Sequence, residues 1–597
     1  MPSPWVGVVV NSPQLDILDS KYKNISSLSQ FHNYDRVGPI VIHCLYWDCF
    51  MATMEGNYVI EKRIRVFSVL ELLIIFLLAI VPLSMTFPYR VNIFLSWEGA
   101  YRLSQGQIPF KDFGMPLGYM YWVIPAIFFK IFGTQMITLV KAQVFINILS
   151  GLAFRSILKS LQVQPGIRLL AVLLYCISFS FFNFWPWYNH TVIVYEMIAI
   201  AFLMRYFFSE SKSWLLLSLS ALFSFFSFFT KQDAGGLGFF LCLVLLAFYS
   251  LKEKRWSPIV IYGVSLAAVA FAIIAPLLRY NFSYWFNYGQ PPHTARVSLF
   301  EVIDEFLMSS QWIKFYLVLI FLIVLAKYRN KRQVFKDLQS SSFLLLTLMI
   351  LVEAAVLQVT SYTPPDNNIF FHSFAIAFIL SNLVDFLRLD FYKLRNVIIG
   401  GGLLVLWWSG VFWKYFEQLS QNAFASLNPQ KRSTENVVNR HTYLVFPSEE
   451  IPMKEWGFSS LKSFKKIYMP KACNEGLDRL LKSSFVKNNK NIRVLNMTEL
   501  TPLAVELPYK LERGEDIPLW SHLGVGMFNK EASMYEQKIL HGYFDLVLFE
   551  YVPHLNNFYP FRVRDTLLNH YLSIDSFPAP RRGNTPGIIE VFVKKIP

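Results

Sequence analysis

Two oppositely charged residues, Glu98 and Arg102, stand four positions apart in a segment that is otherwise rich in aromatic and small residues. On a helix this spacing places both side chains on one face. A carboxylate held beside a cation can act as a general base or can anchor a substrate. The same spacing is typical of a surface ion pair that contributes only a few tenths of a kcal/mol, so both interpretations stay open for the pair alone.

Two more segments hold polar residues that can join such a site. Asp112 lies in a Pro- and Gly-rich stretch, where it is either a turn-capping residue or a second acid. Lys231 stands at a predicted helix boundary, where its amine either meets a phosphate group or only extends toward the nearest polar surface. Gln232 and Asp233 follow it directly and belong to the same candidate group.

Three further segments add candidates that have an equally good structural explanation. His190 stands at the start of a predicted helix, where a histidine is often only a hydrogen-bonded polar group. The loop 278–312 contains Arg296, a candidate phosphate ligand, among aromatic residues that are typical of a membrane-interface belt. Asp366 and His372 lie between two later apolar runs and are either site residues or ordinary polar residues of the membrane interface.

The composition indicates which elements position these residues. Of the 597 residues, 54% are hydrophobic and only 16% are charged, whereas about a quarter are charged in soluble proteins. These values exclude an ordinary soluble protein, a disordered chain and a nucleic-acid-binding protein, despite the net charge of +15. The 5 Cys include no Cys-x-x-Cys pair and predict neither a disulfide framework nor a zinc site. The composition predicts an integral membrane protein, with the lipid bilayer as its surroundings.

A helix needs about 20 mostly apolar residues to cross a bilayer. Such runs lie near 66–84, 136–158, 169–184, 190–208, 213–230, 235–250, 257–277, 313–327, 342–360, 370–386 and 396–415. They predict about eleven transmembrane helices. The stretch 116–133, which contains Pro125 and Lys130, is predicted to lie at the membrane surface instead.

The loop charges predict the orientation. With eleven spans and a cytoplasmic N-terminus, the inner loops carry more than twice as many Lys and Arg as the outer loops. This orientation makes 85–135 the first outer loop and places the C-terminal region outside. Glu98, Asp112 and Lys231 are then all expected at the outer face of the membrane.

The domain organisation follows from changes in composition along the chain. Residues 1–60 are mixed and polar, lack the features of a signal peptide, and are predicted to be an upstream extension or a poorly ordered tail. Residues 61–425 form the predicted transmembrane domain. From 430 to 597, short β-rich runs alternate with helix-like stretches and predict a small extracytoplasmic α/β domain; the runs are 443–446, 492–495, 544–549 and 588–593. The fold class is therefore an α-helical polytopic membrane protein with this C-terminal domain.

The order of short motifs resembles the GT-C superfamily of membrane glycosyltransferases. After the first apolar run come an acid, Glu98, and the segment Gly-x-x-Pro-Phe-x-Asp that ends at Asp112. A Pro-Leu-Gly-x-x-Tyr-Trp stretch that ends in Ile-Phe-Gly precedes the second run. Trp-Pro-Trp-Tyr-Asn-His ends at His190, and Lys-Gln-Asp-Ala-Gly-Gly starts at Lys231. The resemblance covers about 66–390, and its best match is the branch with protein O-mannosyltransferases, aminoarabinose transferases and RgtA/B/C/D-like enzymes.

The resemblance implies that a sugar passes from a polyprenyl-phosphate donor to a glycan, lipid or protein acceptor at the outer membrane face. It assigns Glu98 as base or acceptor-orienting acid and Asp112 as an auxiliary acid. The substrate- and phosphate-binding candidates are Arg102, Lys231, Gln232, Asp233, His190 and Arg296. The family often has two adjacent acids where this chain has Trp97-Glu98. For this reason no metal site and no cofactor are expected.

Two other classes of function remain open. Glu196 and Glu353 lie within predicted spans, and intramembrane carboxylates are what a transporter or lipid flippase needs. Against transport, no paired inverted halves are visible in the sequence. A non-catalytic assembly protein that binds through its outer domain is the third hypothesis. The composition favours a bacterial inner membrane as the location.

Overall fold

The computed structural model describes most of the chain. The described residues are 39–84, 87–88, 93–179, 184–210, 212–290, 299–330, 337–360, 370–407, 409, 451, 455–489, 491–507, 509–521, 523–553, 559–580 and 586–595. For residues 39–60 and a few positions inside later elements, only the backbone is described. The chain divides into two units, Met1–Arg65 and Val66–Pro597.

A long first helix, α2 (Pro39–Ser84), starts in the first unit and continues into the second. The predicted N-terminal extension therefore has helical backbone from Pro39 onward, and residues 1–38 lie outside the described ranges. Whether this extension belongs to the mature protein stays a prediction. From Glu61 onward the helix is long and apolar enough to cross a membrane, as expected for 66–84.

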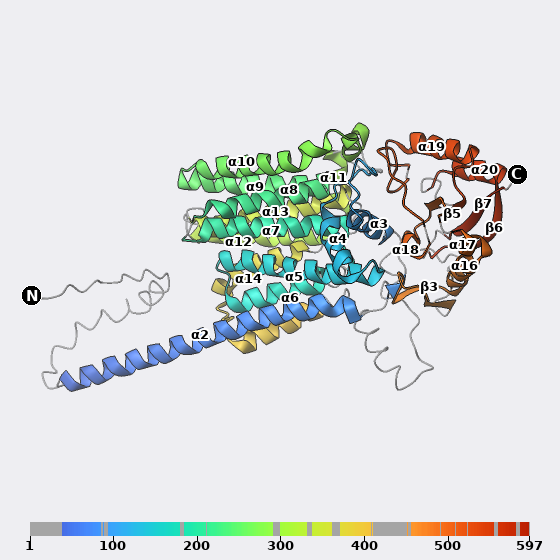
Figure 1. Cartoon of the computed structure of the whole chain (residues 1–597). Coiled ribbons are helices and arrows are strands. Elements are labelled where there is room, and N and C mark those ends of the chain that lie inside the picture. The colour runs from blue at the N-terminus through green and yellow to red at the C-terminus, as the bar shows by residue number, and fades with distance from the viewer. Residues whose placement is uncertain are drawn as a thin grey trace, which may run out of the picture. The chain divides into compact units, whose positions relative to one another are not determined.

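Every one of the eleven predicted apolar runs overlaps a helix (Figure 1). The described helices that are long and apolar enough to span are Glu61–Ser84, α5 (Met136–Ser160), α7 (Tyr188–Phe208), α9 (Gln232–Glu253), α10 (Ser257–Ile274, extended to Leu277) and α13 (Leu338–Thr360). The shorter apolar helices are α4 (Met120–Phe132), α6 (Pro165–Phe179), α8 (Trp214–Thr230), α14 (Phe370–Leu387) and Leu394–Trp407. A bent pair, α11 (Leu299–Ser309) and α12 (Gln311–Asn330), counts as a seventh span if it crosses as one. The predicted class, a multi-pass membrane protein, is confirmed.

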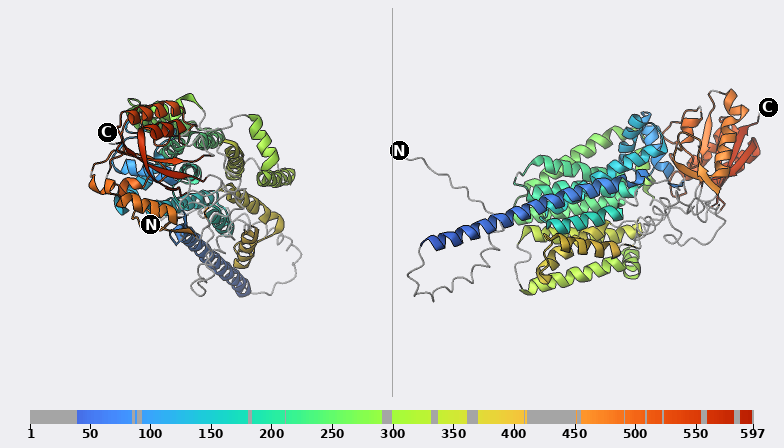
Figure 2. Two further views of the ribbon diagram at one scale, coloured as in Figure 1. Left: turned by 90° about the vertical axis from the view of Figure 1, so that its right-hand side faces the viewer. Right: turned by 90° about the horizontal axis from the view of Figure 1, so that it is seen from below.

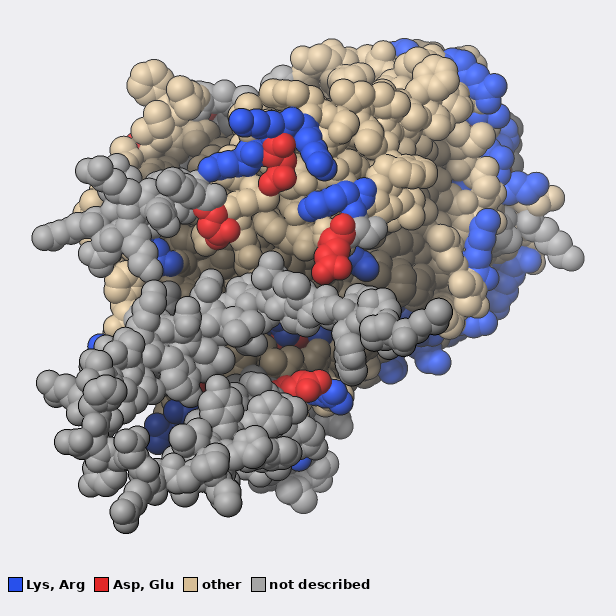
Figure 3. All heavy atoms as spheres, turned by 90° about the vertical axis from the view of Figure 1, so that its left-hand side faces the viewer, with Lys and Arg blue, Asp and Glu red and all other residues tan. Residues whose placement is uncertain are grey.

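Figure 3 shows the end of the second unit that lies opposite its α/β domain. More Lys and Arg than Asp and Glu are visible on this face. Several helices of the bundle carry a basic residue in their last turn, among them Lys159 of α5, Arg205 of α7 and Lys252 of α9. A cation near the C-terminus of a helix interacts favourably with the helix dipole. Basic residues thus gather at one end of the helix bundle, as they gather in the predicted inner loops of the sequence.

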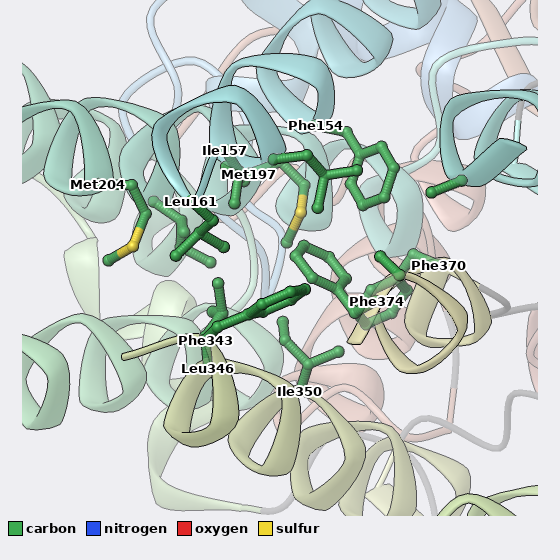
Figure 4. Packing of buried hydrophobic residues seen from close by; sticks show 14 of the residues in the cluster. Phe154, Ile157, Leu161, Met197, Met204, Phe343, Leu346, Ile350, Phe370 and Phe374 are labelled. Atoms are coloured by element: carbon green, nitrogen blue, oxygen red, sulfur yellow. The ribbon is translucent and has the colours of Figure 1, made fainter. Parts of the chain in front are cut away.

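The interior of the bundle is packed by large apolar side chains. Figure 4 shows Phe154 of α5, Met197 of α7, Ile350 of α13 and Phe374 of α14 pointing toward one another. The rings of Phe154 and Phe374 meet edge to face, with their centroids 4.9 Å apart, an arrangement that aromatic pairs prefer.

Two shorter helices follow the first transmembrane helix. These are α3 (Ile93–Ser104) and α4, and they pack against each other. A Cβ added at Gly99 would lie 1.9 Å from the ring of Trp122, so only glycine allows α3 to come this close. The Nε1 of Trp122 donates to the carbonyl of Leu95 at 3.0 Å. With 13 residues, α4 is the shortest of the apolar helices.

The C-terminal region is an α/β domain, as predicted (Figure 2). Its four-stranded sheet has the order β4-β5-β7-β6, in which β4 is parallel to β5 and the other neighbours are antiparallel. The strands are β4 (Val494–Met497), β5 (Leu546–Tyr551), β6 (Tyr571–Pro578) and β7 (Ile588–Lys594). The helices are α16 (Lys471–Lys482), α17 (Ser484–Asn488), α18 (Leu503–Glu506), α19 (Phe528–Leu540) and α20 (Phe561–His570). The run 443–446, expected to be β-rich, lies outside the described residues.

A second, three-stranded sheet joins the segment after α2 to this domain. β1 (Phe87–Pro88), which follows the first helix, pairs in parallel with β3 (Ile467–Pro470), and β3 pairs antiparallel with β2 (Trp456–Phe458). The segment before α3 is therefore held by backbone hydrogen bonds to the C-terminal region. This connection links residues almost 400 positions apart, and composition alone does not reveal it.

The α/β domain also contacts the short helix η4 (Phe282–Gly289), which follows α10. Tyr284 donates its phenolic hydrogen to Glu531 of α19, and the hydroxyl of Ser521 donates to the other oxygen of Glu531 at 3.0 Å. The side-chain oxygen of Asn287 accepts from the backbone N–H of Gly526 at 2.8 Å. Buried polar groups in this contact are thus paired across it, which favours one defined position of the domain.

Glu531 predicts a pH dependence of stability. Burial raises the pKa of Glu531 to about 7, while the hydrogen bonds from Tyr284 and Ser521 act in the opposite direction. The folded state therefore binds this proton more tightly than the unfolded state, so the free energy of unfolding falls as pH rises from about 4.5 to about 7. We expect E531Q to gain about 1 to 3 kcal/mol relative to the wild type between pH 5 and pH 8. Thermal unfolding of the detergent-solubilised chain at both pH values measures this difference. E536Q, at the ion pair with the half-exposed Arg562, is the control, and an equal response of E531Q and wild type would contradict the prediction.

Candidate active site

The Glu98–Arg102 pair lies on one face of α3, as the spacing predicts. Glu98 is 7% exposed and Arg102 is 4% exposed. The Nε and Nη2 atoms of Arg102 both lie 2.8 Å from the same oxygen of Glu98, Oε1. Because both side chains are buried, the interpretation as a surface ion pair is wrong.

The guanidinium group of Arg102 also holds two other segments. Its Nη1 donates to the side-chain oxygen of Gln107 and to the backbone carbonyl of Glu512, both at 2.9 Å. The guanidinium carbon lies 5.2 Å from the centre of the Phe113 ring. Arg102, predicted to bind phosphate, thus makes its described contacts with protein groups, and a phosphate role stays a prediction.

The surroundings of Glu98 make it a stronger base than an exposed carboxylate. Burial is the larger effect and raises the pKa of Glu98, while the charge and hydrogen bonds of Arg102 lower it. A buried carboxylate with a raised pKa and a cation beside it is suited to accept a proton from a substrate hydroxyl. These two opposing effects are what a general base needs.

A segment of the α/β domain, residues 509–521, lies along the loop between α3 and α4, and we call it the strap. Gly114 donates its N–H to the carbonyl of Ile517 and accepts from the N–H of Leu519, both at 2.8 Å. Gly514 of the strap donates to the carbonyl of Asp112 at 2.9 Å. A Cβ at Gly114 would lie 2.2 Å from the ring of Tyr284, so glycine is required where the strap, the loop and η4 meet.

Asp112 caps its own turn. Its Oδ2 accepts the backbone N–H of Ile108 at 2.7 Å, as a turn-capping Asp does. Its side chain does not line the cavity beside Glu98 described below. The auxiliary catalytic role predicted for Asp112 stays a prediction.

Glu98 lines a cavity between α3 and the α/β domain. Its volume is about 40 Å³, which is room for a few water molecules. The lining residues are Phe94, Glu98, Leu495, Asn496, Met497, Thr498, Thr501, Pro518, Leu519, Trp520, Ser521, Tyr535 and Tyr559. All of them except the two from α3 come from the C-terminal domain, so this domain completes the site.

Lys231 lies at the junction of α8 and α9 and is buried. Its Nζ is 3.0 Å from Oδ2 of Asp233 and 5.9 Å from the centre of the Tyr188 ring. Burial lowers the pKa of Lys231, and Asp233 opposes this effect. The side-chain amide of the next residue, Gln232, donates to the carbonyl of Trp285. The predicted group of Lys231, Gln232 and Asp233 is thus assembled as a partly buried polar cluster.

An aromatic layer lies between this cluster and α3. The Tyr188 ring contacts Tyr121 edge to face at 5.9 Å, and Tyr121 packs beside Trp122, whose indole is bonded to α3. His190, near the start of α7, lies two residues beyond Tyr188. These aromatic contacts connect the Lys231 cluster to the helix of Glu98.

The remaining predicted residues lie elsewhere. Arg296 and Asp366 lie outside the described residues. His372, on α14, shares a hydrogen bond of 2.7 Å between its Nδ1 and the hydroxyl of Tyr316, inside the helix bundle. Within the described ranges, no group of three or more His, Cys, Asp or Glu could hold a metal ion; the expectation that no metal or cofactor takes part stays a prediction.

The two intramembrane acids come together in the bundle. Glu196 of α7 and Glu353 of α13 are both buried, and their carboxyl groups are close enough to interact. Gly238 of α9 makes room for Glu196, because a Cβ there would lie 2.6 Å from its carboxyl carbon. This pair is the structural basis for the alternative hypothesis of transport.

Most residues that surround Glu98 were not identified in the sequence. Thr501, Trp520 and the carbonyl of Glu512 reach α3 from about 400 positions further along the chain. No local periodicity or motif marks contacts of this kind. Covariation between positions is the signal that could have found them.

The fold and the site define a multi-pass membrane protein in which an α/β domain covers a buried acid and its cationic partner. No protein-family model matches the chain, and no curated protein matches it. Among solved structures, the chain is similar to the crystal structure of ArnT from Cupriavidus metallidurans in the apo state. Their TM-score is 0.47 at 13% identity, covering 88% of this chain and 98% of that chain. ArnT from the same organism bound to undecaprenyl phosphate gives a TM-score of 0.46 at 13% identity, covering 88% of this chain and 97% of that one. This likeness is distant, and the function has to be inferred from the residues of this chain.

Proposed function

We propose that the chain is a GT-C-type membrane glycosyltransferase that transfers a sugar from a polyprenyl-phosphate-linked donor to a glycan, lipid or protein acceptor. The observation that carries this proposal is the buried Glu98–Arg102 pair at a cavity that α3 shares with the α/β domain. The motif order around Glu98, which resembles the GT-C superfamily, supports the same chemistry. The sequence has no nucleotide-binding glycine motif, which agrees with a lipid-phosphate donor.

In the proposed reaction, Glu98 accepts the proton of the acceptor hydroxyl while the hydroxyl oxygen attacks the anomeric carbon of the sugar. The bond between this carbon and the phosphate oxygen breaks, and the phosphate leaves with the electron pair. Arg102 acts on Glu98 by keeping it ionised and oriented. Lys231 is the proposed cation for the leaving phosphate, because a buried amine stabilises developing negative charge more strongly than an exposed one.

The test supplies the donor directly. Proteoliposomes that contain the full chain are incubated with polyprenyl-phosphate hexoses and pentoses labelled in the sugar, together with lipid extract and glycans from a bacterial cell envelope. We expect transfer of label to one acceptor class and stoichiometric release of polyprenyl phosphate. If no donor loses its sugar in the presence of wild-type protein, the proposal is wrong.

The raised pKa of Glu98 predicts the pH dependence of this transfer. The ionised form is the active base, so the rate falls as pH decreases through the pKa of Glu98. Because burial raises this pKa above the ordinary 4.5, we expect the acid limb of kcat/KM to have its midpoint above pH 4.5. A rate profile from pH 4 to pH 8 measures the midpoint. The residual rate of E98Q should show no such limb, and an unchanged limb in E98Q would assign it to another group.

The proposed orientation places the N-terminus in the cytoplasm and the α/β domain outside, in a bacterial inner membrane. The basic face shown in Figure 3 supports this, because Lys and Arg concentrate in cytoplasmic loops. Single cysteines at Lys254 and at Lys510 test it with a membrane-impermeant thiol reagent in whole cells. We expect the reagent to label position 510 only, and labelling at position 254 would reverse the orientation.

A second candidate function, proton-coupled transport, is favoured by the Glu196–Glu353 pair. Two buried carboxyl groups that interact can share and exchange a proton. The test is proton flux into proteoliposomes that contain a pH-sensitive dye. If the wild type carries a proton flux that E196Q loses, and the wild type transfers no sugar, transport would replace the glycosyltransferase proposal.

A further inference from the structure

One wall of the cavity beside Glu98 has no role in the reaction proposed above. It is formed by the turn that follows β4, together with the strap. Ligands of α/β sheets bind beyond the carboxyl ends of parallel strands, and β4 is parallel to β5. Asn496 and Met497 at this end of β4 line the cavity, and so does Thr498 directly after it.

The turn is rigid and presents polar atoms. The Oδ1 of Asn496 accepts from the hydroxyl of Thr498 at 2.7 Å, and Thr498 in turn accepts the N–H of Leu500 at 3.0 Å. The Nδ2 of Asn496 donates to the carbonyl of Leu500 at 3.2 Å. These bonds fix the turn before any ligand binds, which lowers the entropy cost of binding.

One polar group in this wall has no partner. Thr501 lines the cavity and is 6% exposed, yet its hydroxyl makes no hydrogen bond in the structure. An unpaired buried hydroxyl costs free energy, and a ligand hydroxyl that reaches it recovers that cost. A residue of this wall therefore carries a buried hydroxyl whose hydrogen-bonding capacity is unused.

The charge and aromatic content of the wall identify the ligand class. Among the described lining residues the one charged side chain is Glu98, whose charge Arg102 balances, so this wall offers a phosphate group no cation of its own. Trp520 is half-buried and offers part of its ring at the cavity. An aromatic ring together with hydroxyl and amide groups suits a neutral molecule that has an apolar face and many hydroxyl groups.

We propose that the turn after β4 and the strap form the acceptor subsite, and that the acceptor is a neutral glycan whose reacting hydroxyl enters beside Glu98. This inference rests on the proposed function, since it names the acceptor class of that reaction. The cavity accommodates a hydroxyl-bearing arm of a sugar in place of a few waters. The ring of that sugar packs against Trp520, and the hydroxyl of Thr501 bonds to the arm.

The test measures glycan binding separately from sugar transfer. Detergent-solubilised full-length protein is applied to an array that carries neutral bacterial surface oligosaccharides, Ser/Thr-rich peptides and polyprenyl phosphate. We expect binding to neutral oligosaccharides, about fivefold weaker in T501V and about tenfold weaker or more in W520A. T566V, the same substitution on α20 outside the cavity, should bind as the wild type does. Thermal unfolding shows whether each variant is folded. If W520A does not fold, T501V still tests the subsite, because valine keeps the shape of threonine.

The outcomes separate this inference from the proposed function. Binding only to peptides or only to polyprenyl phosphate, no binding to any oligosaccharide, or glycan binding unchanged in both T501V and W520A would overturn the acceptor subsite. E98Q should bind oligosaccharides normally while it transfers sugar about 10² to 10⁴ times more slowly. If wild-type protein binds glycans through Thr501 and transfers no sugar from any donor, the subsite stands and the glycosyltransferase proposal falls.

Discussion

E98Q is expected to lower the rate of sugar transfer by a factor of about 10² to 10⁴, the usual contribution of a positioned general base. Glutamine has the shape of glutamate, and its amide oxygen can still accept the hydrogen bonds that Arg102 donates to Oε1. What it loses is the ability to accept a proton. The effect should therefore appear in kcat with little change in KM for the donor, since the donor phosphate is assigned to Lys231.

Single-turnover transfer from a labelled polyprenyl-phosphate sugar measures this effect per folded molecule. E536Q removes an acid from the pair with Arg562, outside the cavity, and should keep the wild-type rate within about twofold. E98D retains a base on a shorter side chain and should fall between wild type and E98Q. A rate in E98Q that matches E536Q would remove Glu98 from the reaction.

The sequence predicted the elements of the membrane domain better than it predicted the site. Each of the eleven apolar runs overlaps a helix, because a spanning helix must be apolar along its length and this shows in any window of the sequence. The helical spacing of Glu98 and Arg102 also predicted their contact. Three of the expected β-rich runs became β4, β5 and β7.

What the sequence did not show depends on contacts between distant segments. β6 was not predicted, because Leu572 and Ile574, the apolar residues of its first half, are exposed and the strand lacks a clear buried face. The burial of Glu98 depends on the strap, and no residue near position 98 indicates that a segment near 515 will cover it. A charged pair at helical spacing is exposed in most helices, so only the tertiary structure decides between a surface pair and a buried site.

R102Q is expected to destabilise the protein by about 3 to 5 kcal/mol near neutral pH, the usual cost of leaving one member of a buried ion pair uncompensated. Arg102 also joins α3 to Gln107 and to the strap through the carbonyl of Glu512. Removing it leaves a buried carboxylate and loosens the contact between the strap and the loop. Thermal or denaturant unfolding of the solubilised chain measures the loss. R65Q, which breaks the exposed pair with Glu61, should cost about 0 to 1 kcal/mol.

Charge burial and lost hydrogen bonds predict different behaviour, so the cause of the R102Q effect can be identified. If the buried charge dominates, protonation of Glu98 relieves it, and the destabilisation by R102Q should be smaller at pH 5 than at pH 8. The double variant E98Q/R102Q carries no charge at the site and should be more stable than R102Q alone, with a coupling of about 0.5 to 3 kcal/mol. If the hydrogen bonds to Gln107 and Glu512 dominate, R102Q and the double variant should lose the same stability at both pH values. The first result would show that Arg102 is retained to keep a buried base ionised, which is the role that the proposed reaction requires of it.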